Sequence, residues 1–156
     1  MEQDALSAAL EREHREIDRG IEASAATTDG VPDPTGALTR AMDALRRHIY
    51  LEEALLFPSL RDRLVAPIFV MLREHGQLWS TMAELEDALA GQGSGPTVAD
   101  VRAVLMTQLE THNGKEEPII YPHADTALPA AAATALREFL ATGVTPAGWV
   151  CHAARG

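Results

Sequence analysis

Two stretches of the sequence repeat one another, and this repetition limits the fold more than any other feature. Residues 48–58 (HIYLEEALLFP) and residues 112–122 (HNGKEEPIIYP) carry His, two Glu, an aromatic residue and Pro at the same offsets. An Arg-Glu-His triplet lies ahead of each stretch, ending at His14 before the first and at His75 before the second. The pattern predicts a duplicated two-helix unit, in which each copy supplies two histidines and one His-x-x-x-Glu pair.

Apolar residues recur with the 3.6-residue period of an α-helix along most of the chain, and no segment shows the alternation of a strand. Glycine- and proline-rich breaks separate the periodic segments at residues 30–34, where Asp33 before Pro34 is a candidate helix cap, and at residues 91–96. We expect four long helices over about residues 4–24, 38–58, 67–89 and 98–120, and a short alanine-rich fifth helix over about residues 129–141.

Four long helices joined by short breaks predict an all-α fold, an antiparallel up-down four-helix bundle with a short C-terminal helix and an irregular tail. Residues 1–128 would form the bundle from the duplicated unit. Residues 129–156 would pack on the same domain or extend it. A chain of 156 residues is long enough for one such domain with a substantial core.

Composition narrows the classes of function. The formal net charge is -10, with basic residues scattered among acidic ones, so we expect no nucleic-acid partner. Cys151 is the single cysteine, which excludes an internal disulfide framework and fits a reducing compartment. The N-terminus lacks the pattern of a signal peptide, and no apolar run is long enough to span a membrane. We therefore expect a cytoplasmic protein with no membrane partner.

The histidines and two of the glutamates continue the apolar faces of their helices. An α-helix turns about 100° per residue, so a residue four positions on returns to within about 40° of the first. Glu52 and Glu116 therefore share a face with His48 and His112, whereas the neighbouring glutamates Glu53 and Glu117 should not. The candidate metal ligands are His14, His48, Glu52, His75, His112 and Glu116.

Burial of these six residues would be costly without a metal. An isolated buried carboxylate costs several kcal/mol, about the scale of a domain's whole stability of roughly 5–15 kcal/mol. Metal cations satisfy carboxylates and neutral imidazoles in the interior. Mixed imidazole and carboxylate ligands favour iron or manganese, whereas zinc more often takes four ligands around one ion. If both glutamates and one solvent-derived group bridge two ions, each ion has five ligands and one open position.

These residues resemble the hemerythrin-like proteins with the HHE cation-binding domain. That family carries His on helix one, His-x-x-x-Glu on helix two, His on helix three and a His-carboxylate pair on helix four, and all six positions are filled here. The resemblance covers about 120 of the 156 residues. It implies a hemerythrin-like bundle around two iron ions, oxo- or hydroxo-bridged, ahead of manganese or zinc. It also implies chemistry with O2, H2O2 or NO, or iron handling.

Two positions depart from the oxygen-carrying members of the family. Trp79 stands where those proteins have a fifth histidine, and Glu116 follows its histidine by four residues rather than five. With open metal positions, activation of a bound small molecule is favoured over plain carriage. We expect a peroxidase or oxidase if the protein is an enzyme, with an O2, NO or iron sensing or storage module as the alternative. Repair of iron–sulfur centres is a second alternative, disfavoured because those proteins carry a cysteine-bearing N-terminal domain.

The other chemically distinctive residues lie near the motifs or in the tail. Trp79 would wall the route of small-molecule access or serve as an ordinary core aromatic, and Tyr50 would point away from the site, in packing or at the surface. Phe57 and Tyr121 would plug the end of the bundle, and Pro122 would end the helix before a surface His123. The sequence does not assign a role to Cys151 and His152. An electron-donor protein or a regulatory protein is a possible partner, and the oligomeric state is open.

Overall fold

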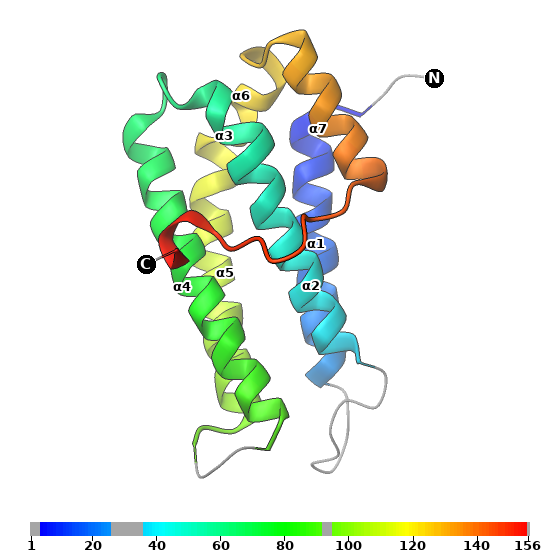
Figure 1. The fold of residues 1–156 in the computed structure, drawn as a ribbon, viewed down its shortest axis with the longest axis vertical. Helices are drawn as coiled ribbons and strands as arrows, with labels where there is room; N and C mark the ends of the chain where they lie inside the picture. Colours follow the sequence, from blue (N-terminus) through cyan, green and yellow to red (C-terminus); the bar gives the residue numbers. More distant parts are fainter. Residues whose placement is uncertain (1–3, 26–35, 92–94, 156) are drawn as a thin grey trace.

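The computed structural model describes residues 4–25, 36–91 and 95–155, and the described chain is helical without a strand. The predicted break at residues 30–34 and the middle of the break at 91–96 lie outside the described residues. Four long helices run antiparallel to their neighbours (Figure 1), which confirms the predicted bundle. They are α1 (Leu6–Ala25), α2 (Ala37–Leu51), α4 (Val65–Leu89) and α5 (Val98–Ile119).

Long helices that follow one another in the chain pack against each other in pairs. Helix α1 packs along α2, α4 packs along α5, and α1 also contacts α5, which closes the bundle. We call residues 6–60 the first copy and residues 65–126 the second copy. A capping box fixes the start of α5 in the second copy. The Thr97 side chain accepts a hydrogen bond from the Asp100 backbone, and the Asp100 side chain accepts one from the Thr97 backbone.

The last helix of each copy continues past its proline, and at Pro122 this contradicts the prediction that the helix ends there. In the first copy, a π-helical segment η1 (Glu52–Leu56) follows α2 and leads into α3 (Phe57–Leu60). In the second copy, α6 (Tyr121–Thr126) follows α5 and includes His123. Pro58 and Pro122 lie in the first turns of α3 and α6, where the missing N–H costs nothing, so neither ends the helical path.

Two apolar clusters fill the bundle above and below the predicted ligands. The upper cluster includes Leu10, Leu56 and Ile68, and the lower cluster includes Leu45 and Leu105, all of which are at most 2% exposed. The six candidate ligands lie between them as a buried polar layer. Amphipathic helices with this pattern bury one stripe each, which places the polar layer at the centre of the fold.

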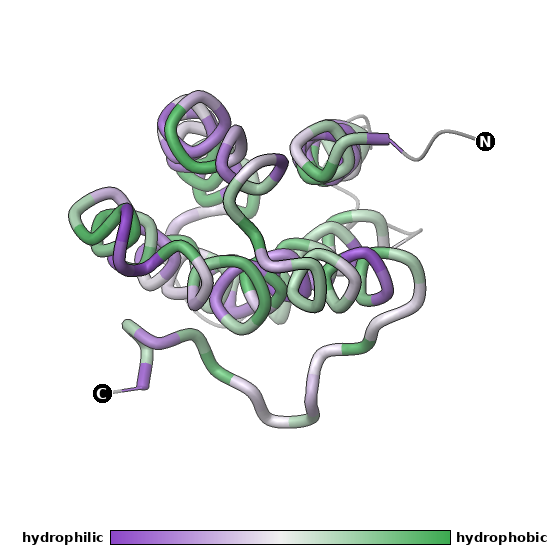
Figure 2. Tube along the Cα trace, turned by 90° about the horizontal axis from the view of Figure 1, so that it is seen from above, coloured by the Kyte–Doolittle hydropathy of each residue, from purple (hydrophilic) through white to green (hydrophobic). Residues whose placement is uncertain are grey.

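The C-terminal segment lies on the outside of the bundle. Helix α7 (Ala130–Thr142) packs on η1, α1 and α2, and the chain then crosses α2 to a 3-10 turn η2 (His152–Ala154) against α4. Figure 2 shows this crossing from above, outside the ring of long helices. Cys151 is fully buried in the lower cluster, so the tail is part of the packed structure. No helix in the described ranges is long and apolar enough to cross a membrane.

Candidate metal centre

The structure brings all six predicted ligands together in the polar layer. His75, Glu52 and Glu116 are fully buried, and the other three histidines are at most 3% exposed. Their donor atoms form two overlapping groups, and within each group the atoms lie within 4.8 Å of one another. The first group holds His14 and His48, the second holds His75 and His112, and both groups contain Glu52 and Glu116.

The turn that carries the glutamate departs from a regular, fully hydrogen-bonded α-helix in each copy, by a different local device. In the first copy the π-helical segment η1 begins at Glu52, and such bulges alter the direction of the side chains they carry. In the second copy Pro118 lies inside α5 at the position equivalent to Ala54 of η1. Proline has no N–H to donate to the preceding turn, so the helix is locally loosened there as well.

Four further glutamates accept hydrogen bonds from the Nδ1 atoms of the histidines, which face away from the centre. Each imidazole Nδ1 lies within hydrogen-bond distance of a carboxylate from a neighbouring helical segment, to which it donates. The pairs are His14–Glu117 at 2.9 Å, His48–Glu13 at 2.9 Å, His75–Glu53 at 2.7 Å and His112–Glu74 at 3.0 Å. A proton held on Nδ1 leaves Nε2 as the inward-facing donor atom, as in metal-binding histidines generally.

Helical periodicity predicts that Glu53 and Glu117 lie off the ligand face, and it gives them no role. They do lie outside the two ligand groups, but each reaches a histidine of the other copy. Glu13 and Glu74 were missed altogether. The signal for them was present, because each Arg-Glu-His triplet places a glutamate directly before a histidine, on the side that faces the next helix.

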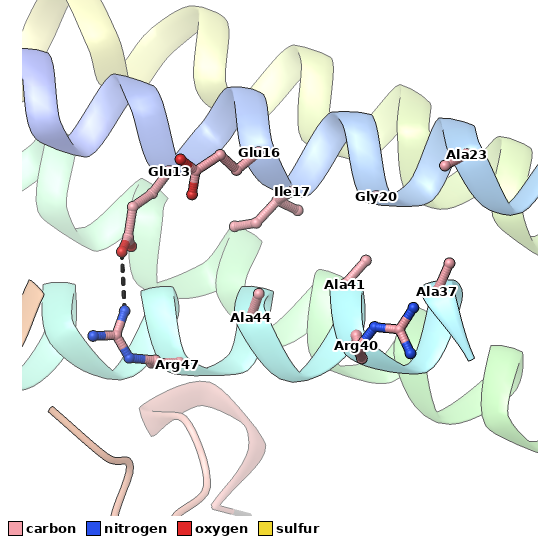
Figure 3. Close-up of a pocket in the computed structure, with 10 residues that line it drawn as sticks. All are labelled: Glu13, Glu16, Ile17, Gly20, Ala23, Ala37, Arg40, Ala41, Ala44 and Arg47. Atoms are coloured by element: carbon pink, nitrogen blue, oxygen red, sulfur yellow. Dashed lines mark hydrogen bonds and ion pairs between the residues drawn. The ribbon is translucent and has the colours of Figure 1, made fainter. Parts of the chain in front are cut away.

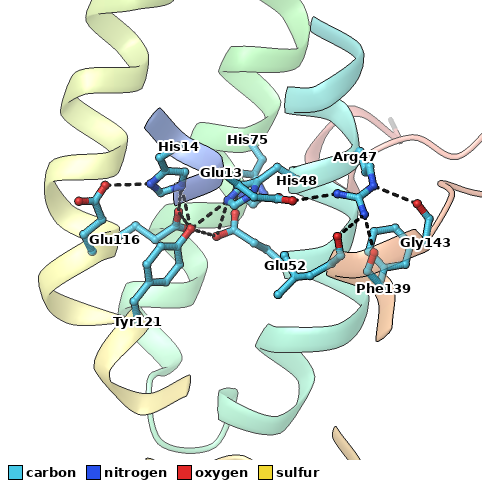
Figure 4. Close-up of polar contacts among 12 residues, drawn as sticks. Glu13, His14, Arg47, His48, Glu52, His75, Glu116, Tyr121, Phe139 and Gly143 are labelled. Carbon is cyan, nitrogen blue, oxygen red and sulfur yellow. Dashed lines mark hydrogen bonds and ion pairs between the residues drawn. The ribbon is translucent and has the colours of Figure 1, made fainter. Parts of the chain in front are cut away.

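Tyr121 is the main correction to the predicted site. The sequence-based prediction placed its side chain at the end of the bundle, but its hydroxyl lies inside the first ligand group (Figure 4). The oxygen is 2.7 Å from His14 Nε2 and 2.9 Å from His48 Nε2, and it contacts Glu52 Oε2 at 2.8 Å and Glu116 Oε1 at 3.0 Å.

Helical periodicity could not have found this residue. Tyr121 follows His112 by nine positions, which on a continuous α-helix would set it about 180° away. The junction between α5 and α6 at Ile120 interrupts that continuity and turns the ring back toward the centre. The available signal was the difference between Phe57 and Tyr121 at equivalent positions, a hydroxyl present in one copy and absent from the other.

The carboxylates of the site favour positive charge at its centre. Burial disfavours the charged form of His48, but the charge of Glu52 and hydrogen bonds to Glu13 and Glu52 outweigh it and raise its pKa to about 10. Burial likewise opposes hydrogen bonds from Glu52 and Glu53 at His75, whose pKa rises to about 9. Without a cation, therefore, protons on the histidines offset the two central carboxylates.

The central carboxylates and the tyrosine respond to the same charges. Burial raises the pKa of Glu116, but the nearby charges of His112 and His14 overcome it and hold that pKa well below its usual value. Burial, with the charges of Glu116 and Glu52, raises the pKa of Tyr121 well above 10. Two carboxylates that stay ionised at the centre of a bundle fit a cation-binding role.

One orphaned atom supports the same conclusion. Glu116 Oε2 is buried and has no hydrogen-bond partner in the described part of the chain, while His112 Nε2 lies 3.5 Å from it. A buried unpaired carboxylate oxygen is costly, and a metal ion would satisfy it. Four inward imidazole nitrogens and two shared carboxylates therefore form a donor set that fits metal ions.

Cavities approach the polar layer from the side of α1. One of about 410 Å³ lies between α1 and α5 and is lined by His14, Asn113 and Glu117. Another, of about 460 Å³, lies between α1 and α2 beside Glu13 (Figure 3). Trp79, which was expected to wall the access route, lines neither of these and packs edge-on against Trp149 of the tail.

The C-terminal segment is bonded to Glu53 directly and is linked to Glu13 through Arg47 of α2. Arg47 donates to the carbonyls of Phe139 and Gly143 and pairs with Glu13 at 2.9 Å (Figure 4). The backbone N–H of His152 donates to Glu53 Oε1 at 2.9 Å. Glu13 and Glu53 each hold a histidine, so the segment after α6 supports the orientation of two candidate ligands.

A four-helix bundle with a buried layer of histidines and shared carboxylates defines a class of metal-binding helical proteins. The comparison with family models makes the assignment specific, since residues 5–124 match the hemerythrin HHE cation binding domain. The chain therefore belongs to the hemerythrin HHE family, as its motifs predicted. Comparisons with curated proteins and with solved structures find no significant match.

Proposed function

We propose that the centre holds two iron ions and that the protein binds and activates a small molecule, namely O2, H2O2 or NO. The observation that carries this proposal is that both glutamates belong to both ligand groups. Shared carboxylates suit two neighbouring cations better than one. Ligands of mixed nitrogen and oxygen type favour iron over zinc, which commonly takes four ligands around one ion.

The residues have distinct tasks in this proposal. The four histidines hold the ions through Nε2, and the outer glutamates fix the ring orientations through Nδ1. Glu52 and Glu116 carry the negative charge that balances the cations. Bound iron would supply the electron-transfer chemistry with the small molecule, and the two apolar clusters would keep bulk water from the centre. An electron-donor protein would complete a catalytic cycle.

Metal analysis tests the ligand assignment. The protein is prepared with iron and compared with His112→Ala, Glu116→Ala and the control His123→Ala, whose side chain lies outside both ligand groups. We expect two irons per chain in the unaltered protein and the control, and a loss of stoichiometric loading in the first two variants. Two irons per chain in all four proteins would contradict the proposal.

A sensing module is the second candidate, and the bonds between the tail and the outer glutamates favour it specifically. A change at the metal centre that moves His48 or His75 would also move Glu13 or Glu53, and the C-terminal segment contacts Glu53 directly and Glu13 through Arg47. Optical spectra through anaerobic reduction and exposure to O2, peroxide or NO separate the two candidates. Repeated cycles that consume reductant indicate activation. Reversible binding accompanied by altered proteolysis of the tail indicates sensing.

A further inference from the structure

We propose that the Tyr121 oxygen is a protein ligand to the cation held by His14 and His48, so that the small molecule binds at the other metal position, beside His75 and His112. This inference rests on the proposed di-iron function and deepens it. It makes the two metal positions chemically unequal, although their histidines and glutamates are equivalent by duplication.

The position of the hydroxyl is the first argument. It lies within 3.0 Å of one donor atom from every member of the first ligand group. Within the described residues, all hydrogen bonds of the hydroxyl go to members of this group. It makes none with His75 or His112, the two histidines of the second group. An oxygen placed among all four donors of one group stands where a cation bound by that group would meet it.

The burial of the side chain is the second argument. Tyr121 is fully buried, and its ring stacks on His14 with centroids 5.2 Å apart, so packing holds the hydroxyl in place. The hydroxyl has one hydrogen for two carboxylate oxygens, Glu52 Oε2 at 2.8 Å and Glu116 Oε1 at 3.0 Å, so it can donate to only one of them at a time. A cation reverses the local charge, so the phenol oxygen can bind it as the proton leaves to solvent.

The equivalent position in the first copy shows why only one metal position is affected. Phe57 stacks on His75 with centroids 5.7 Å apart and an interplanar angle of 13°, as Tyr121 stacks on His14. Phenylalanine has no oxygen to offer, so the cation beside His75 has four protein ligands where its neighbour has five. The position with fewer protein ligands has more room for a small molecule.

Visible spectroscopy of the ferric protein tests the ligand directly, because a phenolate bound to ferric iron gives an intense charge-transfer band with phenolate vibrations in resonance Raman spectra. Tyr121→Phe keeps the ring and removes the oxygen. Tyr50→Phe is the matched control, since Tyr50 is the other tyrosine and packs against Phe139 and Trp149 away from the centre. Iron content is measured for each protein.

We expect the band in the unaltered protein and in Tyr50→Phe, and its loss in Tyr121→Phe with two irons per chain retained. An iron-loaded protein without the band, or a band that survives in Tyr121→Phe, would overturn the inference and leave the di-iron proposal standing. Failure of the unaltered protein to bind iron stoichiometrically would overturn both.

Azide binding to the ferric protein tests the inequality of the two positions. We expect one azide per chain in the unaltered protein and two in Tyr121→Phe. In Phe57→Tyr, which adds a hydroxyl at the second position, we expect azide affinity to fall by tenfold or more and the phenolate band to strengthen. The same azide stoichiometry and affinity in all three proteins would overturn the assignment of the open position.

Discussion

The first and second copies share their histidines and glutamates but differ in the helical turns, an aromatic side chain and the tail contacts around them. The first copy has a π-helical turn, and its Phe57 stacks on His75 of the second copy. Its Arg47 and Glu53 are bonded to the C-terminal segment. The second has a proline in the equivalent turn and a tyrosine hydroxyl in the centre. The features that the two copies share thus give the candidate ligand set, and we expect chemical specificity to depend on the positions where the copies differ.

Coverage by the C-terminal segment is the difference with the largest expected energetic effect. Leu136 of α7 is fully buried in the upper cluster against the first copy. Leu136→Ala should lower the free energy of unfolding by about 2–5 kcal/mol, because it removes buried methyl groups and leaves a cavity. Val104→Ala, at a half-exposed site on α5 of the second copy, should change it by less than about 0.5 kcal/mol. Denaturant unfolding measures both, and equal losses would show that coverage does not distinguish the copies.

Arg47 should give the next largest difference. Arg47→Ala removes the ion pair with Glu13 and the hydrogen bonds to the carbonyls at the end of α7. Hydrogen bonds to charged groups contribute about 1.5–3 kcal/mol each when well formed, and partial exposure here favours the lower end. We expect a loss of about 2 kcal/mol and faster proteolysis after Thr142. Thr111→Ala, the equivalent exposed position in the second copy, should leave both unchanged. An unaltered proteolysis rate in Arg47→Ala would argue against this tie.

The residues that can be predicted from the sequence are those that the two copies share. Helical periodicity and the repeated motif were enough to predict the bundle and to select six residues that the structure brings into one layer. These inferences depend on features repeated in both copies and on the geometry of single helices. Tyr121, Glu13 and Glu74 depend instead on contacts between helices and on a break at Ile120, which no single-helix pattern contains.

The outer glutamates should differ in their effect on metal affinity. Glu53 accepts a hydrogen bond on each oxygen, from His75 and from the backbone of His152, so glutamine would turn an N–H toward one of these donors. Glu53→Gln should weaken iron binding about 10–100-fold, the usual range for such supporting residues. Glu117 is about one-third exposed (36%), so Glu117→Gln can direct its carbonyl to His14 and its amide to water, with a smaller loss. Equal losses in competition titrations with a chelator would show that the tail does not contribute.

Two glycines of the second copy should give the smallest and most local contrast. Gly114 lies in α5 with open space where a Cβ would be, so Gly114→Ala should stabilise the protein by about 1 kcal/mol through helix propensity. At Gly76 on α4 a Cβ would lie 2.7 Å from the Cβ of Ala153 in η2, so Gly76→Ala should lose that gain because the tail must shift. Thermal unfolding compares the two variants. Adding Ala153→Gly to Gly76→Ala should restore the gain, and failure of this pair to recover it would place the cost elsewhere than in the contact between α4 and the tail.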